Sequence, residues 1–544
     1  MLKKLVFLTK WIVTLGITLS LPLSKAQADP IDNNVDLVDS IKPFTPDVSV
    51  IGSASDNAPT EFHVSLKMRD LGGLQARIDQ GEQISPEELE QRYYPTKEDY
   101  QKIVQWLQTK GFSVETFPHR LLIIVQGKVN QVQNTLGVNL KQVMVEGKTY
   151  LATDKPPRIP RSMKSMVLGI NGLQPYLHAH RSIQSVQPLS LTTPFVPPYS
   201  ISDLKTAYGI NRVALNGSGQ RMGIVVTVFP YDSDLSTFWR NQNIPQSLNN
   251  IEKVCTGLSS SCNGPLTEEE TLDTEMASGL APAAKVRIYA TGSLSPQAFD
   301  EAYSRLVIDQ SYSSTKLQQV SVSYGFCEQS ISPSQVLTDY QFFKSLAALG
   351  VTVLAASGDN GAFGDKCPSN SSSFSVDYPA SDVNVTSVGG TRLSLNSNGT
   401  VFTEFGWSGS GGGTSSYFSR PSWQVGPGVP TGTQRLVPDV SVVADPKTGV
   451  YIYWNGSGDI VGGTSAAAPL WNAMTALINQ NRSNLGLPPL GNLAPRLYPL
   501  INTPNLRDIT IGSNGGFLAG PGYDQVTGVG VPVFNQLVNT LSQF

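Results

Sequence analysis

The spacing of apolar residues differs between the two halves of the chain. In residues 29–188, Ile103, Val104, Trp106 and Leu107 have the spacing of an amphipathic helix. Short strand-like runs follow at 121–125 and 142–145. The mixture predicts a compact α+β domain.

From residue 190 onward, strand-like apolar runs alternate with stretches long enough for helices. The clearest strands are 222–228, 284–290, 319–323 and 351–356. This alternation predicts an α/β domain with a mostly parallel sheet and helices on both faces. Functional residues are then expected in loops beyond the carboxyl ends of the strands.

The N-terminus has the pattern of a secretory signal peptide over residues 1–28. Lys3 and Lys4 precede an apolar stretch from Trp11 to Leu23, and the small residues 26–28 follow. A membrane anchor is the weaker reading, because Lys10 interrupts the run and leaves it short for a span. We therefore expect a secreted protein, extracellular or periplasmic, with no membrane attachment after signal removal.

A polar, proline-containing stretch from His178 to Pro198 separates the two blocks. It is typical of an exposed linker, where proteolysis concentrates. We place a maturation site within residues 181–198.

Composition excludes some functions and suggests disulfides. The 544 residues are 40% hydrophobic and carry a net charge of −3 without a long run of one sign, which does not indicate nucleic-acid binding. Four cysteines in an exported chain favour two disulfides, with three possible pairings. We favour Cys255–Cys262 and Cys327–Cys367, whose spacing is poor for zinc.

The strongest local motif is Gly-Gly-Thr-Ser-Ala-Ala-Ala-Pro at residues 462–469. Ser465 stands between a glycine turn and an alanine-rich segment, which predicts a hydroxyl at a helix N-terminus near free N–H groups. That suits a nucleophile, although a helix-capping serine or threonine is a common alternative.

A serine nucleophile needs a base, and histidine is poorly placed to supply it. The four histidines are His63, His119, His178 and His180, so a chain cut in the linker would hold none. The base must then be a carboxylate or a lysine. Glu269 and Asp273 are four apart in an acidic segment, and on a helix their carboxyls share one face. Close carboxyls titrate as a coupled pair, although an acidic first helical turn is a frequent structural feature.

Two further acidic groups have candidate roles. Asp359 follows the strand-like run 351–356, and a protonated aspartic acid there could donate to an oxyanion; an Asp-Asn-Gly turn is the structural alternative. Near the C-terminus, Asp508 and Asp524 flank a Gly-Pro-Gly segment. Two carboxylates with nearby carbonyls suit a hard cation such as calcium.

Taken together, these motifs resemble the sedolisin family of serine-carboxyl peptidases. Glu-x-x-x-Asp, Ser-Gly-Asp, Gly-Gly-Thr-Ser-Ala-x-x-Pro, Asp-Ile and Ala-Gly-Pro-Gly-aromatic-Asp occur in family order. The resemblance implies Ser465 as nucleophile, Glu269 as general base and acid, and Asp273 orienting Glu269. It also implies that Asp359 completes the oxyanion hole. One structural Ca²⁺ would be bound by Asp508 and Asp524 and by the carbonyls of Ile509, Gly520 and Gly522.

The resemblance also implies a domain plan. A ferredoxin-like prodomain (29–180), acting as intramolecular inhibitor and chaperone, would precede the linker (181–198) and a subtilisin-like peptidase domain (199–544). The segment Ser321–Gly325 resembles an edge strand that pairs with substrate backbone. We expect a monomer that acts on proteins or peptides, either as an endopeptidase or as a tripeptidyl-peptidase.

Two other functions are compatible with parts of this sequence pattern. An inactive exported binding protein on a protease scaffold would show no cleavage at acid pH. A subtilisin with a histidine base would need His178 or His180 and would have a neutral optimum.

Overall fold

The computed structural model of the chain describes residues 33–187, 195–257, 262–365, 367 and 373–543. The predicted signal peptide lies outside the described residues. Within those residues no helix combines the length and the apolar character needed to span a bilayer.

The N-terminal domain is built on a four-stranded antiparallel sheet in the order β4-β5-β3-β9. Its elements in chain order are β3 (Pro59–Leu66), α3 (Lys97–Thr109), β4 (Ser113–Thr116), β5 (Leu122–Lys128), α4 (Val129–Leu136) and β9 (Val167–Asn171). This βαββαβ order is that of the ferredoxin-like fold, as predicted. Apolar residues of α3 and α4 pack on one face of the sheet, with Ile103, Leu107 and Val132 fully buried.

A smaller antiparallel sheet and short helices complete that domain. They are β2 (Ser49–Ser53), α1 (Leu71–Asp79), α2 (Pro86–Glu88), β6 (Lys141–Val145) and β7 (Lys148–Ala152). The order of the small sheet is β2-β6-β7.

The C-terminal domain has a central sheet in the order β13-β14-β12-β15-β17-β19-β20, with β23 also paired to β19. The strands are β12 (Arg221–Val226), β13 (Ile251–Cys255), β14 (Lys285–Ala290), β15 (Gln319–Val322), β17 (Thr352–Ala356), β19 (Val385–Leu395), β20 (Val401–Gly406) and β23 (Val440–Val443). All their pairings are parallel except β19 with β20. The predicted mostly parallel α/β architecture is confirmed.

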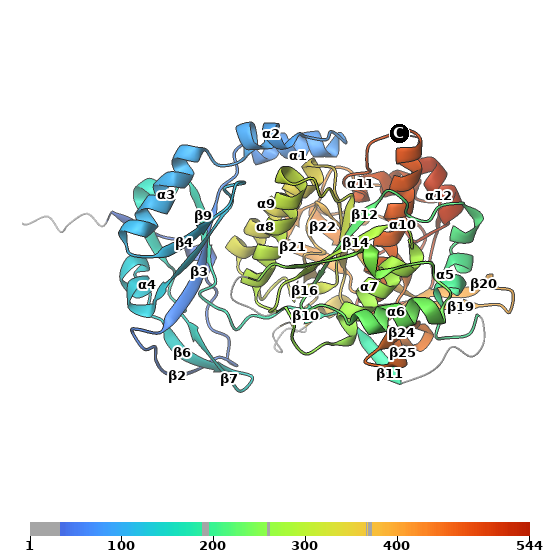
Figure 1. The fold of residues 1–544 in the computed structure, drawn as a ribbon, viewed down its shortest axis with the longest axis horizontal. Helices are drawn as coiled ribbons and strands as arrows, with labels where there is room; N and C mark the ends of the chain where they lie inside the picture. Colours follow the sequence, from blue (N-terminus) through green and yellow to red (C-terminus); the bar gives the residue numbers. More distant parts are fainter. Residues whose placement is uncertain (1–32, 188–194, 258–261, 366, 368–372, 544) are drawn as a thin grey trace, which may run out of the picture.

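Helices cover both faces of this sheet (Figure 1). Ile224 and Val226 of β12 belong to the core under one set of helices, whereas Val225 belongs to the core under the other. This alternation is what a strand buried on both faces requires. The first set includes α6 (Asp232–Asn241), α7 (Glu268–Leu280), α10 (Thr464–Asn484) and α12 (Phe534–Leu541); the second is α8 (Pro296–Tyr312) and α9 (Pro333–Ala348).

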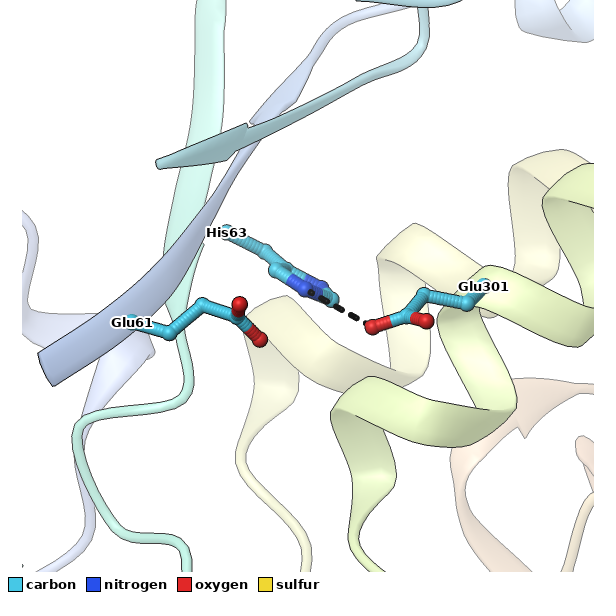
Figure 2. A group of neighbouring side chains, drawn as sticks. All are labelled: Glu61, His63 and Glu301. Atoms are coloured by element: carbon cyan, nitrogen blue, oxygen red, sulfur yellow. Dashed lines mark ion pairs between the residues drawn. The ribbon is translucent and has the colours of Figure 1, made fainter. Parts of the chain in front are cut away.

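The N-terminal domain docks on α8 and α9 (Figure 1). Leu74 and Leu121 share a buried apolar cluster with Phe299 and Phe342 of those helices. Polar contacts cross the same interface. His63 of β3 points toward α8, where its Nε2 lies 3.8 Å from Glu301 (Figure 2) and its Nδ1 2.9 Å from Asp300.

Both favoured disulfides are present. Cys255 is bonded to Cys262, closing a short loop, and Cys327, the last residue of β16 (Tyr324–Cys327), is bonded to Cys367, 40 residues later in the sequence.

Candidate active site

Ser465 lies in the first turn of α10, as its motif predicts. β25 (Ser457–Gly462) leads through Gly463 into this helix, and Gly463 has a φ of +114°, which favours glycine. Ser465 is fully buried, and its Oγ donates a 3.3 Å hydrogen bond to the carbonyl of Ser323.

The acidic segment forms α7, which packs along α10. Its Glu270 is held in a capping box: one carboxyl oxygen accepts the N–H and hydroxyl of Thr267. The other accepts the hydroxyls of Tyr324 and Thr227. Glu270 is therefore occupied as an acceptor, which distinguishes it from the neighbouring Glu269.

Glu269 and Asp273 are both fully buried, one helical turn apart. Burial raises the pKa of each well above its ordinary value, and the charge of Asp273 raises the pKa of Glu269 further. The nearby Ser465 hydroxyl acts in the opposite direction and lowers the pKa of Glu269. Both carboxyl oxygens of Glu269 are buried without a hydrogen-bond partner among the described residues. Ser323 donates a 2.6 Å hydrogen bond to Asp273 Oδ1, which orients this carboxyl. The pair is suited to share one proton and to exchange another with Ser465.

Asp359 reaches the same place from the loop after β17. Its Oδ1 accepts hydrogen bonds from the N–H (2.8 Å) and hydroxyl (2.9 Å) of Thr464, the residue before Ser465. Oδ2 is buried with no hydrogen-bond partner among the described residues. Burial, and next the charge of Asp365, raise the pKa of Asp359 to about 8. A protonated Oδ2 would thus be a donor available through acid and neutral pH.

The loop that carries Asp359 needs a close backbone contact. Gly411 donates from its N–H to the carbonyl of Gly358 at 2.8 Å. A Cβ on Gly411 would lie 1.9 Å from the carbonyl oxygen of Ser357, so a side chain there would displace the loop.

The histidines do not serve Ser465. His63 and His119 lie in the N-terminal domain and contact α8 of the C-terminal domain, His63 at Asp300 and His119 at Ser304. The ring of His178 packs on Tyr150. His180 Nε2 lies 3.1 Å from Asp377 and 3.5 Å from Asp365. This geometry opposes a histidine base.

Sequence reasoning missed three contributors. Ser323 was noted only as part of a strand, yet it contacts both Asp273 and Ser465. Thr464 orients Asp359 by two hydrogen bonds. Its position directly before Ser465 in the sequence could have suggested a role in the site. Asp365 belongs to no recognisable motif, although it lies only six residues after Asp359; its carboxyl accepts the N–H of Asp359 at 2.7 Å.

The expectation of a fully exposed linker was wrong for its first residues. His180 and Ser182 are 4% and 1% exposed, because β10 (His180–Arg181) and β11 (Gln184–Gln187) pair with strands of the C-terminal domain. The polar side chains suggested an exposed segment, but main-chain pairing between strands does not depend on side-chain polarity. Residues 188–194 of the linker lie outside the described residues.

Asp508 and Asp524 meet at the turn 520–522. The N–H of Gly522 donates to Asp508 Oδ2 (2.8 Å) and that of Gly520 to Asp524 Oδ2 (3.1 Å). Asp508 Oδ1 is buried without a hydrogen-bond partner among the described residues. Asp508 Oδ1 is therefore the available ligand atom for a hard cation such as calcium. Both oxygens of Asp524 already accept hydrogen bonds from Gly520, Val526 and Thr527, so a cation would have to replace some of these.

Comparison with known proteins agrees with this architecture. Residues 46–176 match the pro-kumamolisin activation domain and residues 229–493 match the subtilase family. Kumamolisin from Bacillus sp. (strain MN-32) is 32% identical over 447 residues, covering 77% of this chain and 78% of the relative. Sedolisin from Pseudomonas sp. (strain 101) is 29% identical over 518 residues, covering 86% and 84%.

A solved structure of Pseudomonas sedolisin, a serine-carboxyl proteinase complexed with two molecules of pseudo-iodotyrostatin, superposes with a TM-score of 0.56 at 28% identity. It covers 64% of this chain and 98% of that one. With an activation domain ahead of a subtilase-like domain and this similarity to kumamolisin, the chain belongs to the sedolisin family of serine-carboxyl peptidases.

Proposed function

We propose that this peptidase is a secreted zymogen that matures itself and hydrolyses proteins in acid, with Ser465, Glu269, Asp273 and Asp359 as its catalytic residues. The observation that carries the proposal is the pair of buried carboxyls, Glu269 and Asp273, beside Ser465 in the first turn of α10. A pair that shares a proton can accept one from serine without imidazole.

Each residue has a role that follows from its contacts. Ser465 Oγ attacks the peptide carbonyl carbon while Glu269 takes its proton, later passing it to the departing amine. Asp273, oriented by Ser323, stabilises the charge changes on Glu269. The N–H of Ser465 and the protonated Oδ2 of Asp359 stabilise the oxyanion. Water then hydrolyses the acyl-enzyme by the reverse proton movements.

Acid pH favours this mechanism because two groups must hold protons. Asp359 donates only when protonated, and its pKa of about 8 keeps it so in acid and at neutral pH, so this group limits activity only at alkaline pH. The Glu269–Asp273 pair must retain one proton, which its raised pKa values favour. The oxyanion contribution of Asp359 should fade as pH rises through its pKa.

The test compares the full-length wild type with Ser465→Ala, Glu269→Gln and Glu268→Gln after a shift from pH 7 to about pH 4. Glu268 is the matched control, because it precedes Glu269 but is partly exposed. Wild type and Glu268→Gln should shed the prodomain and digest a denatured protein, whereas Ser465→Ala should do neither and Glu269→Gln should do both at least about a hundredfold more slowly. If Ser465→Ala matures and digests the substrate as wild type does, Ser465 is not the nucleophile; if neither protein cleaves anything across acid pH, the inactive-scaffold reading replaces this one.

We also propose one structural Ca²⁺ held by Asp508, Asp524 and the carbonyls of Ile509, Gly520 and Gly522. A cation would neutralise two carboxylates and tie the C-terminal turn to the domain. At a hundredfold excess over its dissociation constant it should stabilise the fold by about 2.7 kcal/mol. The measurement is the unfolding midpoint of Ser465→Ala with calcium or chelator, with Asp508→Asn as the variant that should not respond.

A further inference from the structure

The chain's own linker crosses the active site as a substrate would. β10 pairs antiparallel with β16 (Tyr324–Cys327), placing His180 opposite Gly325 and Arg181 opposite Tyr324. β11 pairs antiparallel with β25, placing Gln184 opposite Gly462. Ser182 and Ile183 join these two pairings and therefore pass over the start of α10, where Ser465 lies.

The carbonyl of Ser182 lies beside the groups assigned to the oxyanion, and one of them binds it. The N–H of Ser465 donates to it at 3.0 Å. A Cβ built on Gly463 would lie 2.1 Å from this carbonyl oxygen and 2.5 Å from Asp359 Oδ2, so the two oxygens converge on the space that glycine leaves open. The N–H of Ser182 donates to the carbonyl of Ser323 at 3.4 Å, and the Ser465 hydroxyl donates to the same carbonyl at 3.3 Å. The Ser465 hydroxyl and the Ser182 peptide are thus held side by side, because both donate to the carbonyl of Ser323.

The side chain two residues earlier is bound in an acidic subsite. His180 Nε2 lies 3.1 Å from Asp377 Oδ2 and 3.5 Å from Asp365 Oδ2. Asp377 accepts the N–H of Asp365 at 3.1 Å, and Asp365 accepts the N–H of Asp359 at 2.7 Å. The subsite is therefore linked by hydrogen bonds to the oxyanion residue.

We propose that the Ser182–Ile183 peptide bond is the bond that the zymogen first cleaves in itself, and that Asp365 and Asp377 select a cationic side chain two residues before the cleaved residue. This rests on the proposed function of Ser465. Ser465 Oγ bonds to the Ser182 carbonyl carbon and its proton passes to Glu269; the bond to the Ile183 nitrogen then breaks and that nitrogen takes the proton. Water hydrolyses the Ser182 ester, leaving a carboxylate at Ser182 and a new amino terminus at Ile183.

The bound segment also continues past the subsite. Ala179, the third residue before Ser182, is 1% exposed and donates its N–H to the carbonyl of Leu294 at 2.8 Å. The cleft thus accepts chain on both sides of the bond and beyond His180, which is the geometry for cleaving internal bonds. A tripeptidyl-peptidase would instead require a free amino terminus at His180.

The first experiment follows the wild-type zymogen after acidification, with intact mass and N-terminal sequencing at early times. We expect a prodomain fragment ending at Ser182 and a product beginning at Ile183. A first cut elsewhere, in an enzyme that still digests a denatured protein, overturns the inference while leaving the proposed function intact. No cut and no digestion overturns the proposed function instead.

The second experiment tests the subsite. His180→Gln should slow the first cut at least tenfold, whereas His178→Gln, whose ring packs on Tyr150 outside the subsite, should not. Because both positions leave with the prodomain, all mature enzymes should have one mass and one activity. Mature wild type should also prefer His over Gln at the corresponding position of N-acetylated peptides by at least tenfold, and Asp377→Asn should reduce that preference. Equal rates for His180→Gln and wild type, or no preference among peptides, overturn the subsite.

Discussion

Asp359 provides a sharp test because its two carboxyl oxygens have different surroundings. Oδ1 accepts two hydrogen bonds from Thr464, and Oδ2 is the proposed donor. Asp359→Asn keeps an acceptor and supplies an N–H in place of the acid proton, whereas Asp359→Ala removes both. Losing one oxyanion donor typically costs about 2.7–4 kcal/mol, or about 10²–10³ in kcat. Asp359→Ala should lose that much at pH 4, and Asp359→Asn should stay within about tenfold of wild type, a difference of about 1.4 kcal/mol.

The pH dependence separates a donor from a merely structural residue. Wild type loses the Asp359 proton as pH rises through about 8, whereas an amide keeps its N–H. The activity ratio of Asp359→Asn to wild type should therefore rise by up to about tenfold between pH 7 and one unit above that pKa. Initial rates on a quenched peptide, with matured enzymes from pH 3 to 9, give kcat and KM. Equal defects in both variants, or a ratio that does not change with pH, would refute the donor role.

Three further outcomes are expected. Glu269→Gln and Asp273→Asn should each lower kcat by about 10²–10⁴ with little change in KM, since both act on proton transfer; an unchanged kcat would remove either from the mechanism. Loss of the Cys327–Cys367 disulfide should destabilise the zymogen by about 4 kcal/mol, because the unfolded chain gains the entropy of an open loop. Loss of Cys255–Cys262 should cost less, because the bonded residues are 7 rather than 40 apart in sequence; equal unfolding midpoints for the two variants would contradict this. Burial lowers the pKa of His63, but the hydrogen bond and charge of Asp300 outweigh burial, so the pKa is raised overall. The charged His63 therefore stabilises the folded zymogen fully below about pH 6.5, and this stabilisation is lost as pH rises through the raised pKa. His63→Gln should therefore lower the free energy of unfolding of an inactive zymogen by about 3 kcal/mol in acid, and this difference from the parent should narrow at alkaline pH; a difference that widens would refute the sign.

The central sheet could be predicted because its pattern is local. Four apolar runs were identified, and all four became neighbouring parallel strands, for example 351–356 as β17. Burial on both faces makes such strands nearly continuous apolar runs, which composition reveals directly. The positions of Glu269 and Asp273 on one helix followed equally from spacing.

What could not be predicted depends on pairings between distant segments. His180, Asp365 and Asp377 show no common spacing, and they meet only because β10 and β18 (Asp377–Tyr378) flank β16. The linker looked exposed because its side chains are polar. Its burial comes from main-chain hydrogen bonds, which almost any sequence can make. Main-chain pairing of this kind also allows the cleft of a protease to bind the linker of its own precursor.

The three adjacent glutamates of α7 show how the helix selects one base from an acidic run. Successive residues turn by about 100° around a helix, so three neighbours cannot share a direction. Glu268 is partly exposed, Glu270 turns back to the N–H and hydroxyl of Thr267, and Glu269 faces Ser465. The capping box thus does two things: it begins the helix at a fixed residue and it occupies the carboxyl that would otherwise compete as a base. A shift of this helix start by one residue would put Glu268 or Glu270 beside Ser465, one solvated and the other without its capping partners. The chemistry therefore depends on where the helix begins as much as on the presence of acidic residues.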